Sequence, residues 1–160
     1  MTMEQNGMGR KLSEYNGIWK ENEEIYRVAA KRLGLPEGAF WILYTLREAG
    51  REMTQSEVCQ AMYEPKQTVN SALKKLERDG IIELLEMKDK RSKRCHLTEK
   101  GKYLAEGTVD KVIVAERRAL ADMEEEEMAV FFKLFHKFTG LLRENVNAEL
   151  DCRGSIVIER

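Results

Sequence analysis

Long apolar runs, cysteine pairs and histidine clusters are all missing from this 160-residue sequence. No stretch approaches the roughly 18 consecutive apolar residues that mark a membrane-spanning helix, and the start of the chain lacks the apolar run of a secretory signal. We therefore expect no membrane contact and a cytoplasmic location. The length suits a single domain, or a small domain with an elaboration, that buries a real hydrophobic core.

Cysteine and histidine are too scarce and too scattered to predict a disulfide framework or a metal site. The three cysteines, Cys59, Cys95 and Cys152, form no Cys-x-x-Cys pair, so we assign them structural or incidental roles. Only Cys95, beside two basic residues, has surroundings that favour a reactive thiol. The two histidines, His96 and His136, lack partners at ligand spacing, and no Gly-rich phosphate loop or catalytic triad stands out. We expect no enzyme activity, no metal and no cofactor.

Net charge is also nearly absent, at −1, but the charges are distributed unevenly. Residues 66–102 hold eleven Lys and Arg against six Asp and Glu, whereas the rest of the chain is acidic. A basic working surface on an acidic body is one interpretation of this asymmetry, and an ordinary solvated basic face is the other. The distribution alone does not decide between them.

Hydrophobic periodicity predicts a mainly α protein with one small β-hairpin. Apolar residues at three- and four-residue spacing from Leu12 to Leu33 indicate an amphipathic helix, and an almost wholly apolar helix is expected over 37–49. Residues 1–9 carry two glycines and no periodic pattern, and residues 150–160 have no clear assignment. We expect both ends to be flexible tails.

The C-terminal part of the chain predicts two long helices. The first is expected over 99–121, with Gly107 as a weak point. The second is expected from Glu124, capped by Asp122 and opened by four glutamates that suit the positive end of the helix dipole. Four of the five phenylalanines fall between 131 and 138. One small domain seldom needs so concentrated an aromatic face, so we expect burial against a second copy of the chain.

The middle of the chain predicts two short helices joined by a three-residue turn. Thr54-Gln55-Ser56-Glu57 has the pattern of a capping box at the start of the first helix, and Tyr63-Glu64-Pro65 forms the turn. The second helix, over 65–79, has its core positions at Val69, Ala72, Leu73 and Leu76. Two short helices of this kind occur in DNA-binding proteins and in simple helical hairpins, so the composition of the outward face has to distinguish them.

That outward face has no acidic residue and favours DNA. Asn and Gln pair with adenine in the major groove, and Lys reaches guanine or phosphate. Contacts from Gln55 and Thr68 to the DNA backbone would position the protein without specifying sequence. The residues in this region that we expect to contact DNA are Gln55, Lys66, Gln67, Thr68, Asn70, Ser71 and Lys74. A solvated polar helix face is the alternative interpretation.

A highly basic β-hairpin follows, with strands expected at 81–85 and 95–97. Six of the seven residues between Met87 and Cys95 are charged, and five are basic. Such side chains find strong negative potential in a narrow minor groove. Those expected to contact DNA are Lys90, Arg91, Lys93 and Arg94. Asp89 either orients Arg91 through a bidentate bond or forms a surface ion pair of little energetic value.

The run from Met53 to Lys102 resembles the MarR family of bacterial winged helix-turn-helix regulators. The most specific feature is Asp89-Lys90-Arg91, followed at the family's distance by Leu97-Thr98-Glu99-Lys100-Gly101. This looks like the family's wing signature, an Asp-x-Arg that leads into Leu-Thr-x-x-Gly. With the long terminal helices included, the resemblance covers about residues 10–147. It implies that Arg91 enters the minor groove while Asp89 braces it.

The resemblance also implies a function and an assembly. A winged helix-turn-helix domain over 36–98 would bind double-stranded DNA, and a helical region over 10–34 and 99–147 would form a homodimer. Such a dimer holds its recognition helices about 34–36 Å apart on a pseudo-palindromic site. We expect a sequence-specific transcriptional regulator that acts as a repressor by occlusion. A winged-helix module that binds a protein partner instead of DNA is the alternative.

Many members of this family release DNA on binding a small aromatic anion, or on oxidation of a cysteine near the amino terminus. Regulation by oxidation of such a cysteine is not expected here, because no cysteine precedes Cys59. The candidate ligand cleft is lined by aromatic residues of the first two helices, namely Tyr15, Trp19, Tyr26, Trp41 and Tyr44. Aromatic residues at helical spacing more often pack in a core, so both interpretations stay open. If the cleft exists, we expect a planar apolar anion to weaken DNA binding.

Overall fold

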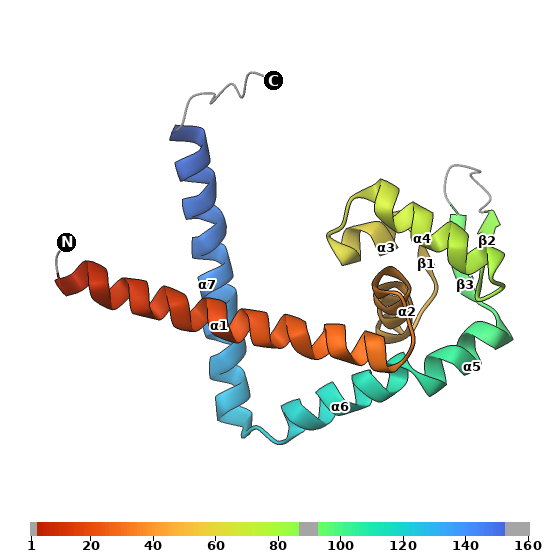
Figure 1. Cartoon of the computed structure of the whole chain (residues 1–160), viewed down its shortest axis with the longest axis horizontal. Helices are drawn as coiled ribbons and strands as arrows, with labels where there is room; N and C mark the ends of the chain where they lie inside the picture. Colours follow the sequence, from red (N-terminus) through yellow and green to blue (C-terminus); the bar gives the residue numbers. More distant parts are fainter. Residues whose placement is uncertain (1–2, 87–92, 153–160) are drawn as a thin grey trace. The chain divides into compact units, whose positions relative to one another are not determined.

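The fold is mainly α-helical with one small antiparallel sheet, as the sequence predicts (Figure 1). A computed structural model describes residues 3–86 and 93–152. In chain order the elements are α1 (Met3–Arg32), α2 (Glu37–Ala49), β1 (Met53–Thr54), α3 (Gln55–Met62), α4 (Lys66–Arg78), β2 (Ile82–Glu86), β3 (Lys93–Leu97), α5 (Glu99–Gly107), α6 (Val109–Ala121) and α7 (Glu125–Cys152). They divide into two compact units, residues 1–115 and 116–160, which are described separately.

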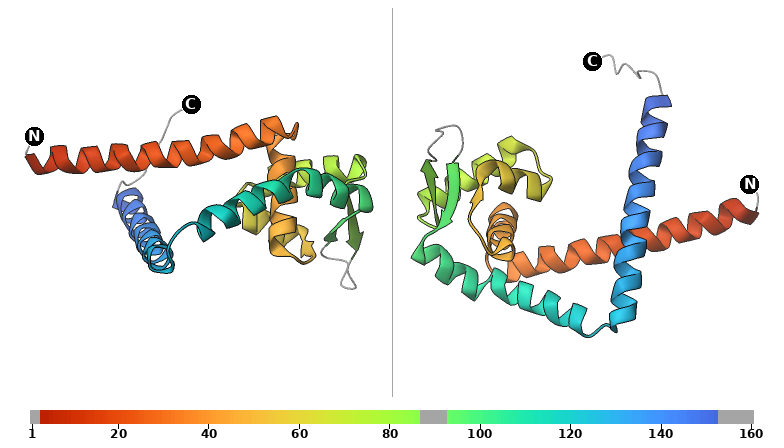
Figure 2. Two further views of the ribbon diagram at one scale, coloured as in Figure 1. Left: turned by 90° about the horizontal axis from the view of Figure 1, so that it is seen from below. Right: turned by 180° about the vertical axis from the view of Figure 1, so that it is seen from behind.

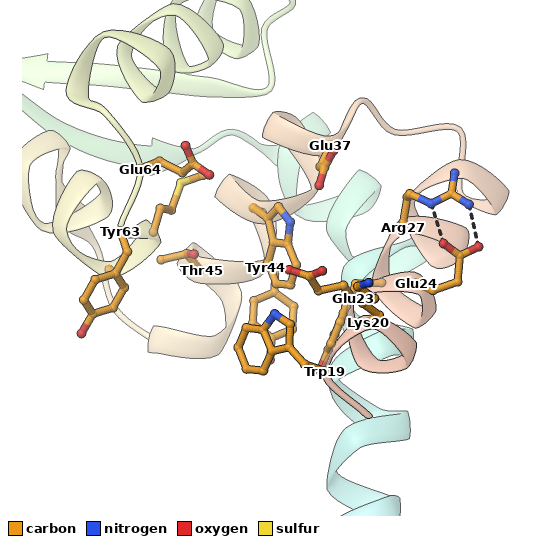
Figure 3. Close-up of a pocket in the computed structure, with 14 residues that line it drawn as sticks. Trp19, Lys20, Glu23, Glu24, Arg27, Glu37, Tyr44, Thr45, Tyr63 and Glu64 are labelled. Carbon is orange, nitrogen blue, oxygen red and sulfur yellow. Dashed lines mark hydrogen bonds and ion pairs between the residues drawn. The ribbon is translucent and has the colours of Figure 1, made fainter. Parts of the chain in front are cut away.

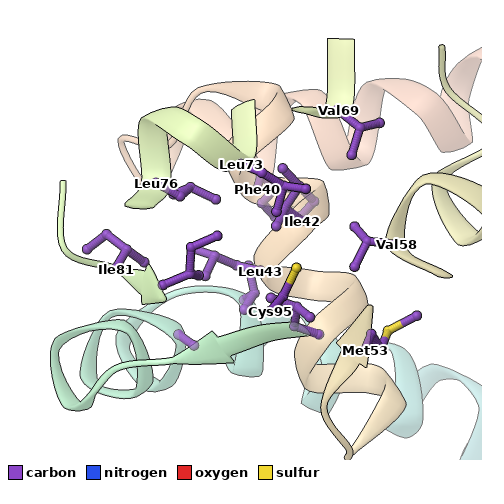
Figure 4. Close-up of a cluster of buried hydrophobic side chains, with 14 of the residues drawn as sticks. Phe40, Ile42, Leu43, Met53, Val58, Val69, Leu73, Leu76, Ile81 and Cys95 are labelled. Carbon is purple, nitrogen blue, oxygen red and sulfur yellow. The ribbon is translucent and has the colours of Figure 1, made fainter. Parts of the chain in front are cut away.

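Helix α2 is the centre of the first unit. It lies among α1, α3, α4 and α5 and contacts all four (Figure 2). Its apolar sequence accordingly buries Phe40, Ile42 and Leu43 completely. Residues from α3, α4 and the sheet complete this core, among them Val58, Val69, Leu73, Leu76, Ile82 and Cys95 (Figure 4). Each large apolar side chain buried in this way contributes about 1.5–3 kcal/mol. The core fixes α4 by one face and leaves its opposite face to solvent.

The capping box predicted at the start of α3 is confirmed. The Glu57 backbone N–H donates to Thr54 Oγ1 at 3.2 Å, and the Thr54 backbone N–H donates to Glu57 Oε2 at 2.7 Å. Arg51 forms an ion pair with the same carboxylate at 2.9 Å. The backbone bond from Thr54, followed by the bond from Arg51, lowers the pKa of Glu57 from 4.5 to about 2.

Glu57→Gln is expected to destabilise the protein at neutral pH and to lose this effect in acid. Because the pKa of Glu57 is lower in the folded state than in the unfolded state, the charged carboxylate adds stability above about pH 4.5. That stability disappears as the pH falls towards about 2. Urea denaturation at pH 7 should therefore give a lower midpoint for the variant, and the two midpoints should converge between these values. A difference that stays constant over the whole range would contradict this account; Glu48→Gln, an exposed change on α2, is the control.

The sheet has the strand order β1-β3-β2, and both pairs are antiparallel. The β2–β3 ladder runs from Ile82 opposite Leu97 to Glu86 opposite Lys93, which confirms the expected hairpin. Strand β1 was not expected, because two residues are too few to show a period and are defined by pairing with β3. Residues 87–92, which connect β2 to β3, lie outside the described residues.

The segment after β3 fastens α5 to the turn that follows α4. Thr98 Oγ1 accepts the Gly101 N–H at 3.0 Å and donates to the Gly80 carbonyl oxygen at 2.7 Å. Gly101 is buried against the backbone of Ile81, where an added Cβ would lie 2.0 Å from the carbonyl oxygen. No larger residue fits there without moving the backbone, so this part of the Leu-Thr-x-x-Gly pattern has a structural basis.

The long helix predicted over 99–121 is divided at its expected weak point. Helix α5 ends at Gly107, and Thr108 leaves helical geometry with φ −127° and ψ −93°. Helix α6 then begins, and Asp110 in its first turn accepts two hydrogen bonds from Arg47 of α2, one of them 2.7 Å long. These bonds raise the pKa of Arg47 and tie α6 to the central helix.

Helix α1 begins at Met3, so the expectation of an irregular tail over 1–9 is wrong for residues 3–9. Gly7 and Gly9 each weaken a helix by only about 1 kcal/mol, and the neighbouring residues favour a helix. Within the first unit, the N-terminal half of α1 extends away from the other elements (Figure 2). Its apolar side chains are therefore exposed, as Leu12 and Ile18 show.

Helix α7 of the second unit begins and ends differently from the prediction. The Glu124 N–H donates to Glu127 Oε2 at 3.0 Å, whereas the Asp122 N–H bonds to Arg118 of α6. Glu124 therefore caps α7, and Asp122 belongs to the end of α6. The helix continues to Cys152, so residues 150–152 are helical and only 153–160 of the expected tail lie outside the described residues.

The phenylalanines of α7 form an exposed face, here called the α7 aromatic face. It consists of Phe131, Phe132, Phe135 and Phe138, which are 38–46% exposed. Phe131 stacks on Phe135 with ring centroids 5.8 Å apart, and it meets Phe132 edge to face at 5.3 Å. The rings thus lie close to each other along one helix. Leu134, Leu141 and Leu142 of the same helix are also more than 40% exposed.

Candidate nucleic-acid interface

Opposite its buried face, helix α4 presents a polar face of uncharged and basic side chains. Val69, Leu73 and Leu76 point into the core, with at most 5% of their surface exposed. Five of the residues expected to contact DNA are all exposed on this helix, namely Lys66, Gln67, Thr68, Ser71 and Lys74. No acidic residue lies in the first turn. The structure therefore brings these donors together on one accessible helix surface.

Two of the expected contact residues are more enclosed than the sequence suggests. Asn70 is half-buried, and its Oδ1 accepts a weak hydrogen bond from Cys59 Sγ of α3 at 4.0 Å. Gln55 is half-buried at the first position of α3. Ser71 is exposed, but its hydroxyl donates to the Gln67 carbonyl oxygen at 2.8 Å, which leaves the hydroxyl oxygen as an acceptor.

A polar cluster that the sequence did not reveal joins the loop before β1 to β3, and it is formed by Glu52, Arg94 and His96. Glu52 Oε2 accepts from Arg94 at 3.1 Å, and Glu52 Oε1 lies 2.8 Å from His96 Nδ1. The bonds from His96 and then Arg94 lower the pKa of Glu52. Arg94, expected to contact DNA, is therefore held by a carboxylate from the loop before β1. Its neighbour Lys93 is exposed at the start of β3, opposite Glu86.

The remaining wing residues named from the sequence are not placed by the structure. Asp89, Lys90 and Arg91 lie outside the described residues. The roles expected for them, minor-groove contact by Arg91 and bracing by Asp89, therefore stay predictions. The described ends of the hairpin, Glu86 and Lys93, pair directly across the ladder, so these three residues belong to the segment that joins the two strands.

A cleft of about 870 Å³ lies between α1, α2 and the end of α3 (Figure 3). Its aromatic lining consists of Trp19, Tyr26, Trp41, Tyr44 and Tyr63. The Trp41 ring meets Tyr44 edge to face at 5.5 Å and lies 5.1 Å from Tyr26. Of the aromatic residues expected in this cleft, only Tyr15 is outside its lining. Trp41 also packs on buried Phe40, so this residue serves both the core and the cleft.

One wall of the cleft is the turn that leads into α4. Ala61, Met62, Tyr63 and Glu64 all line it. Tyr63 caps α3 in the left-handed region, with φ +52°, and its side chain is 96% exposed. Since Lys66 begins α4 only two residues after Glu64, the cleft adjoins the start of the helix that carries the polar face.

Comparisons with known proteins identify the family. The model of the MarR family matches residues 33–92. YwoH of Bacillus subtilis (strain 168), an uncharacterized HTH-type transcriptional regulator, is 31% identical to this chain over 119 residues, which make up 74% of this chain and 82% of YwoH. The chain belongs to the MarR family. This confirms the resemblance based on the wing signature.

Solved structures of MarR regulators share its fold. NMB1585, a MarR family regulator from Neisseria meningitidis, is similar with a TM-score of 0.74 and 22% identity, over 87% of this chain and 98% of NMB1585. The organohalide-sensing regulator RdhR-CbdbA1625, in its 2,4-dichlorophenol-bound form, has a TM-score of 0.59 and 21% identity, over 81% of this chain and 79% of that protein. The family and fold are those of DNA-binding transcription regulators, not of enzymes.

In this MarR-family chain Cys95 has the structural role expected for it, and not the reactivity that its basic neighbours in the sequence suggest. Cys95 is 1% exposed, and burial raises the pKa of its thiol to about 11. Side chains alternate along a strand, so the adjacent Arg94 points away from the face that carries the sulfur. Cys59 is also buried. Both thiols are core residues.

The part of the MarR-family chain that the structure describes contains neither a grouping of metal ligands nor a membrane-spanning helix. No three His, Cys, Asp or Glu side chains within residues 3–86 and 93–152 are grouped so that they could hold a metal ion. Over the same ranges, no helix combines the length and the apolar character needed to cross a membrane.

Proposed function

We propose that this MarR-family regulator is a repressor that binds a pseudo-palindromic DNA operator as a homodimer and is released by a small aromatic ligand. The exposed face of α4 carries the proposal. Gln67 and Lys74 are base-reading side chains for the major groove, while Thr68 and Ser71 contact the backbone. Lys66 stands at the positive end of the helix dipole, where a bound phosphate offsets an otherwise unfavourable position.

The wing supplies the second DNA contact in this proposal. Arg91 enters the minor groove, where the narrow walls strengthen the negative potential, and Lys90 and Lys93 contact phosphates. Arg94 differs from the others because Glu52 holds its guanidinium. We assign Arg94 a role in which Glu52 fixes its direction, which limits the conformational freedom that it loses on contact with DNA.

The second copy of the chain is proposed to cover the α7 aromatic face. Contiguous exposed apolar surface of this kind marks interaction sites in proteins that remain soluble. The exposed apolar residues in the N-terminal half of α1, such as Leu12 and Ile18, belong to the same proposed interface. In this proposal the dimerisation region comprises residues 10–34 and 99–147, and the winged helix-turn-helix domain comprises residues 36–98.

The cleft is the proposed ligand site. Its volume of about 870 Å³ is in the range of small-molecule sites, and five of its fourteen lining residues are aromatic. A ligand there contacts the α3–α4 turn at Met62, Tyr63 and Glu64. Since this turn sets the start of α4, a ligand that displaces it moves the DNA-contacting face and lowers the affinity for the operator.

Selection from random DNA, followed by binding measurements with Lys74→Ala, tests the DNA-binding proposal. We expect a palindromic motif, and an affinity that falls steeply with salt because each neutralised phosphate releases counterions. Lys74→Ala should weaken operator binding by about tenfold or more, which is the range for loss of one good base contact.

Lys111→Ala, which removes an exposed lysine of α6, is the matched control and should leave the affinity unchanged. No enriched DNA motif, together with equal behaviour of the two lysine variants, would favour the alternative of a winged-helix module that binds a protein.

A further inference from the structure

We infer that the cleft between α1, α2 and α3 selects an aromatic cation, and not the aromatic anion that the family resemblance suggests. This inference rests on the proposed role of the cleft as the ligand site. Four carboxylates and two basic groups line the cleft, so its walls carry an excess of negative charge. A ligand interacts most strongly with those of these charges that are not already paired with each other.

The arginine of the lining, Arg27, is already paired with a carboxylate. Arg27 Nε donates to Glu24 Oε2 at 2.7 Å, and a second guanidinium nitrogen donates to Glu24 Oε1 at 2.6 Å. These bonds raise the pKa of Arg27 and lower that of Glu24, so both groups remain charged and bound to each other. The fork that would bind a ligand carboxylate is therefore occupied.

Apart from the pair of Arg27 and Glu24, the charged groups of the lining are three carboxylates and one lysine. Glu23, Glu37 and Glu64 form no ion pair within the described residues, and neither does Lys20. Figure 3 shows the Glu23 carboxylate turned toward the aromatic side chains, whereas Arg27 and Glu24 face each other away from them. Even if Lys20 neutralises one carboxylate, the lining keeps a net negative charge. An anion entering this cleft meets like charge, which disfavours it.

The aromatic lining gives a cation a second source of attraction. The ring faces of Trp and Tyr carry negative potential, and a cation within about 6 Å of a ring centroid is attracted to it. Trp19, Trp41 and Tyr44 come from two helices and surround the same space. Aromatic rings combined with carboxylates form the chemistry that recognises quaternary ammonium groups and other organic cations.

A cation also provides a direct connection to DNA binding. Glu64 belongs to the α3–α4 turn and lies two residues before the first residue of α4. Attraction between a bound cation and Glu64 therefore acts on the backbone that positions α4. A neutral ligand fills the same space without this attraction.

Tryptophan fluorescence measures occupation of the cleft without DNA. The chain has two tryptophans, Trp19 and Trp41, and both line the cleft. The probes are benzyltrimethylammonium, neutral benzyl alcohol and the anion phenylacetate, which do not absorb at the red edge of tryptophan excitation. We expect the cation to change the emission with a Kd about tenfold lower than that of benzyl alcohol, and lower still relative to phenylacetate.

The double variant Glu23→Gln/Glu64→Gln should raise the Kd of the cation about tenfold and leave that of benzyl alcohol unchanged. Glu14→Gln, on the same α1 helix but outside the lining, is the control and should leave all three Kd values unchanged. Equal or tighter binding of phenylacetate overturns the inference, as does a cation Kd that the double variant does not change.

The two proposals fail in different ways. If the cation binds with the expected preference but leaves operator affinity unchanged, the charge selectivity of the cleft stands and the proposed release of DNA is wrong. If none of the probes changes the emission, the cleft is not a site for them and the inference is overturned. DNA binding itself is tested separately by its salt dependence and by Lys74→Ala.

Discussion

Gly101→Ala should lower the free energy of unfolding by about 3 kcal/mol or more, the upper range for overpacked sites. The added methyl group would lie 2.0 Å from the Ile81 carbonyl oxygen, 3.1 Å from its carbonyl carbon and 3.2 Å from Leu97 Cδ2. Two of these three atoms are backbone, so no side chain can rotate to relieve the clash. The start of α5 has to move away from Ile81, which breaks the bonds of Thr98 to the turn after α4.

Gly107→Ala provides a matched control on the same helix. Among the described residues outside its own stretch of helix, no heavy atom lies within 4 Å of a Cβ at this position, and Gly107 is exposed. Because alanine favours a helix over glycine, this change should be neutral or stabilise the protein by up to about 1 kcal/mol. Urea denaturation of the two variants and the parent chain measures both effects. Similar stability of the two variants would show that α5 does not require the close approach at Gly101.

Phe131→Glu/Phe135→Glu should convert the proposed dimer to a monomer and lower operator affinity by about a hundredfold or more. The two stacked rings lie on the α7 aromatic face, and two carboxylates there cannot be buried against a partner without a large desolvation cost. A monomer loses the gain that comes from binding two half-sites at once, which typically exceeds a hundredfold. Sedimentation measures the mass, and titration with operator and half-site DNA measures the affinity.

Lys133→Glu tests whether added negative charge alone explains such a result. At about 100° per residue, Lys133 lies on the side of α7 opposite Phe131, and it is exposed. This variant should stay dimeric, and circular dichroism should show that both proteins keep their helices. A double phenylalanine variant that still dimerises with unchanged operator affinity would remove the α7 aromatic face from the proposed interface.

Local signals in the sequence predicted most of the helices. The apolar run of α2, the capping box at Thr54 and Glu57, and the weak point at Gly107 each depend on residues within one or two turns of each other. Such patterns report local structure directly. The polar face of α4 was predictable for the same reason, because helical spacing determines which residues lie opposite Val69 and Leu73.

Features that depend on distant pairing were missed. Glu52 reaches Arg94 and His96 across more than 40 positions of sequence, and only the pairing of β1 with β3 brings them together. The same pairing decides which way Cys95 faces, because a shift of one residue would exchange the two sides of the strand. The charges of the cleft were missed for a similar reason, since Glu23 and Glu64 line the same cleft only in the folded chain.

Side-chain hydrogen bonds join the end of α4 to the start of α5. Thr98 Oγ1 holds the Gly80 carbonyl oxygen at 2.7 Å, and Lys100 Nζ holds that of Asp79 at 2.8 Å, so the end of α4 and the start of α5 cannot separate while these bonds remain. A rotation of α5 therefore pulls on the C-terminal end of α4 through these bonds. We therefore expect a rearrangement that changes the direction of α5 to change the direction in which the polar face of α4 points as well.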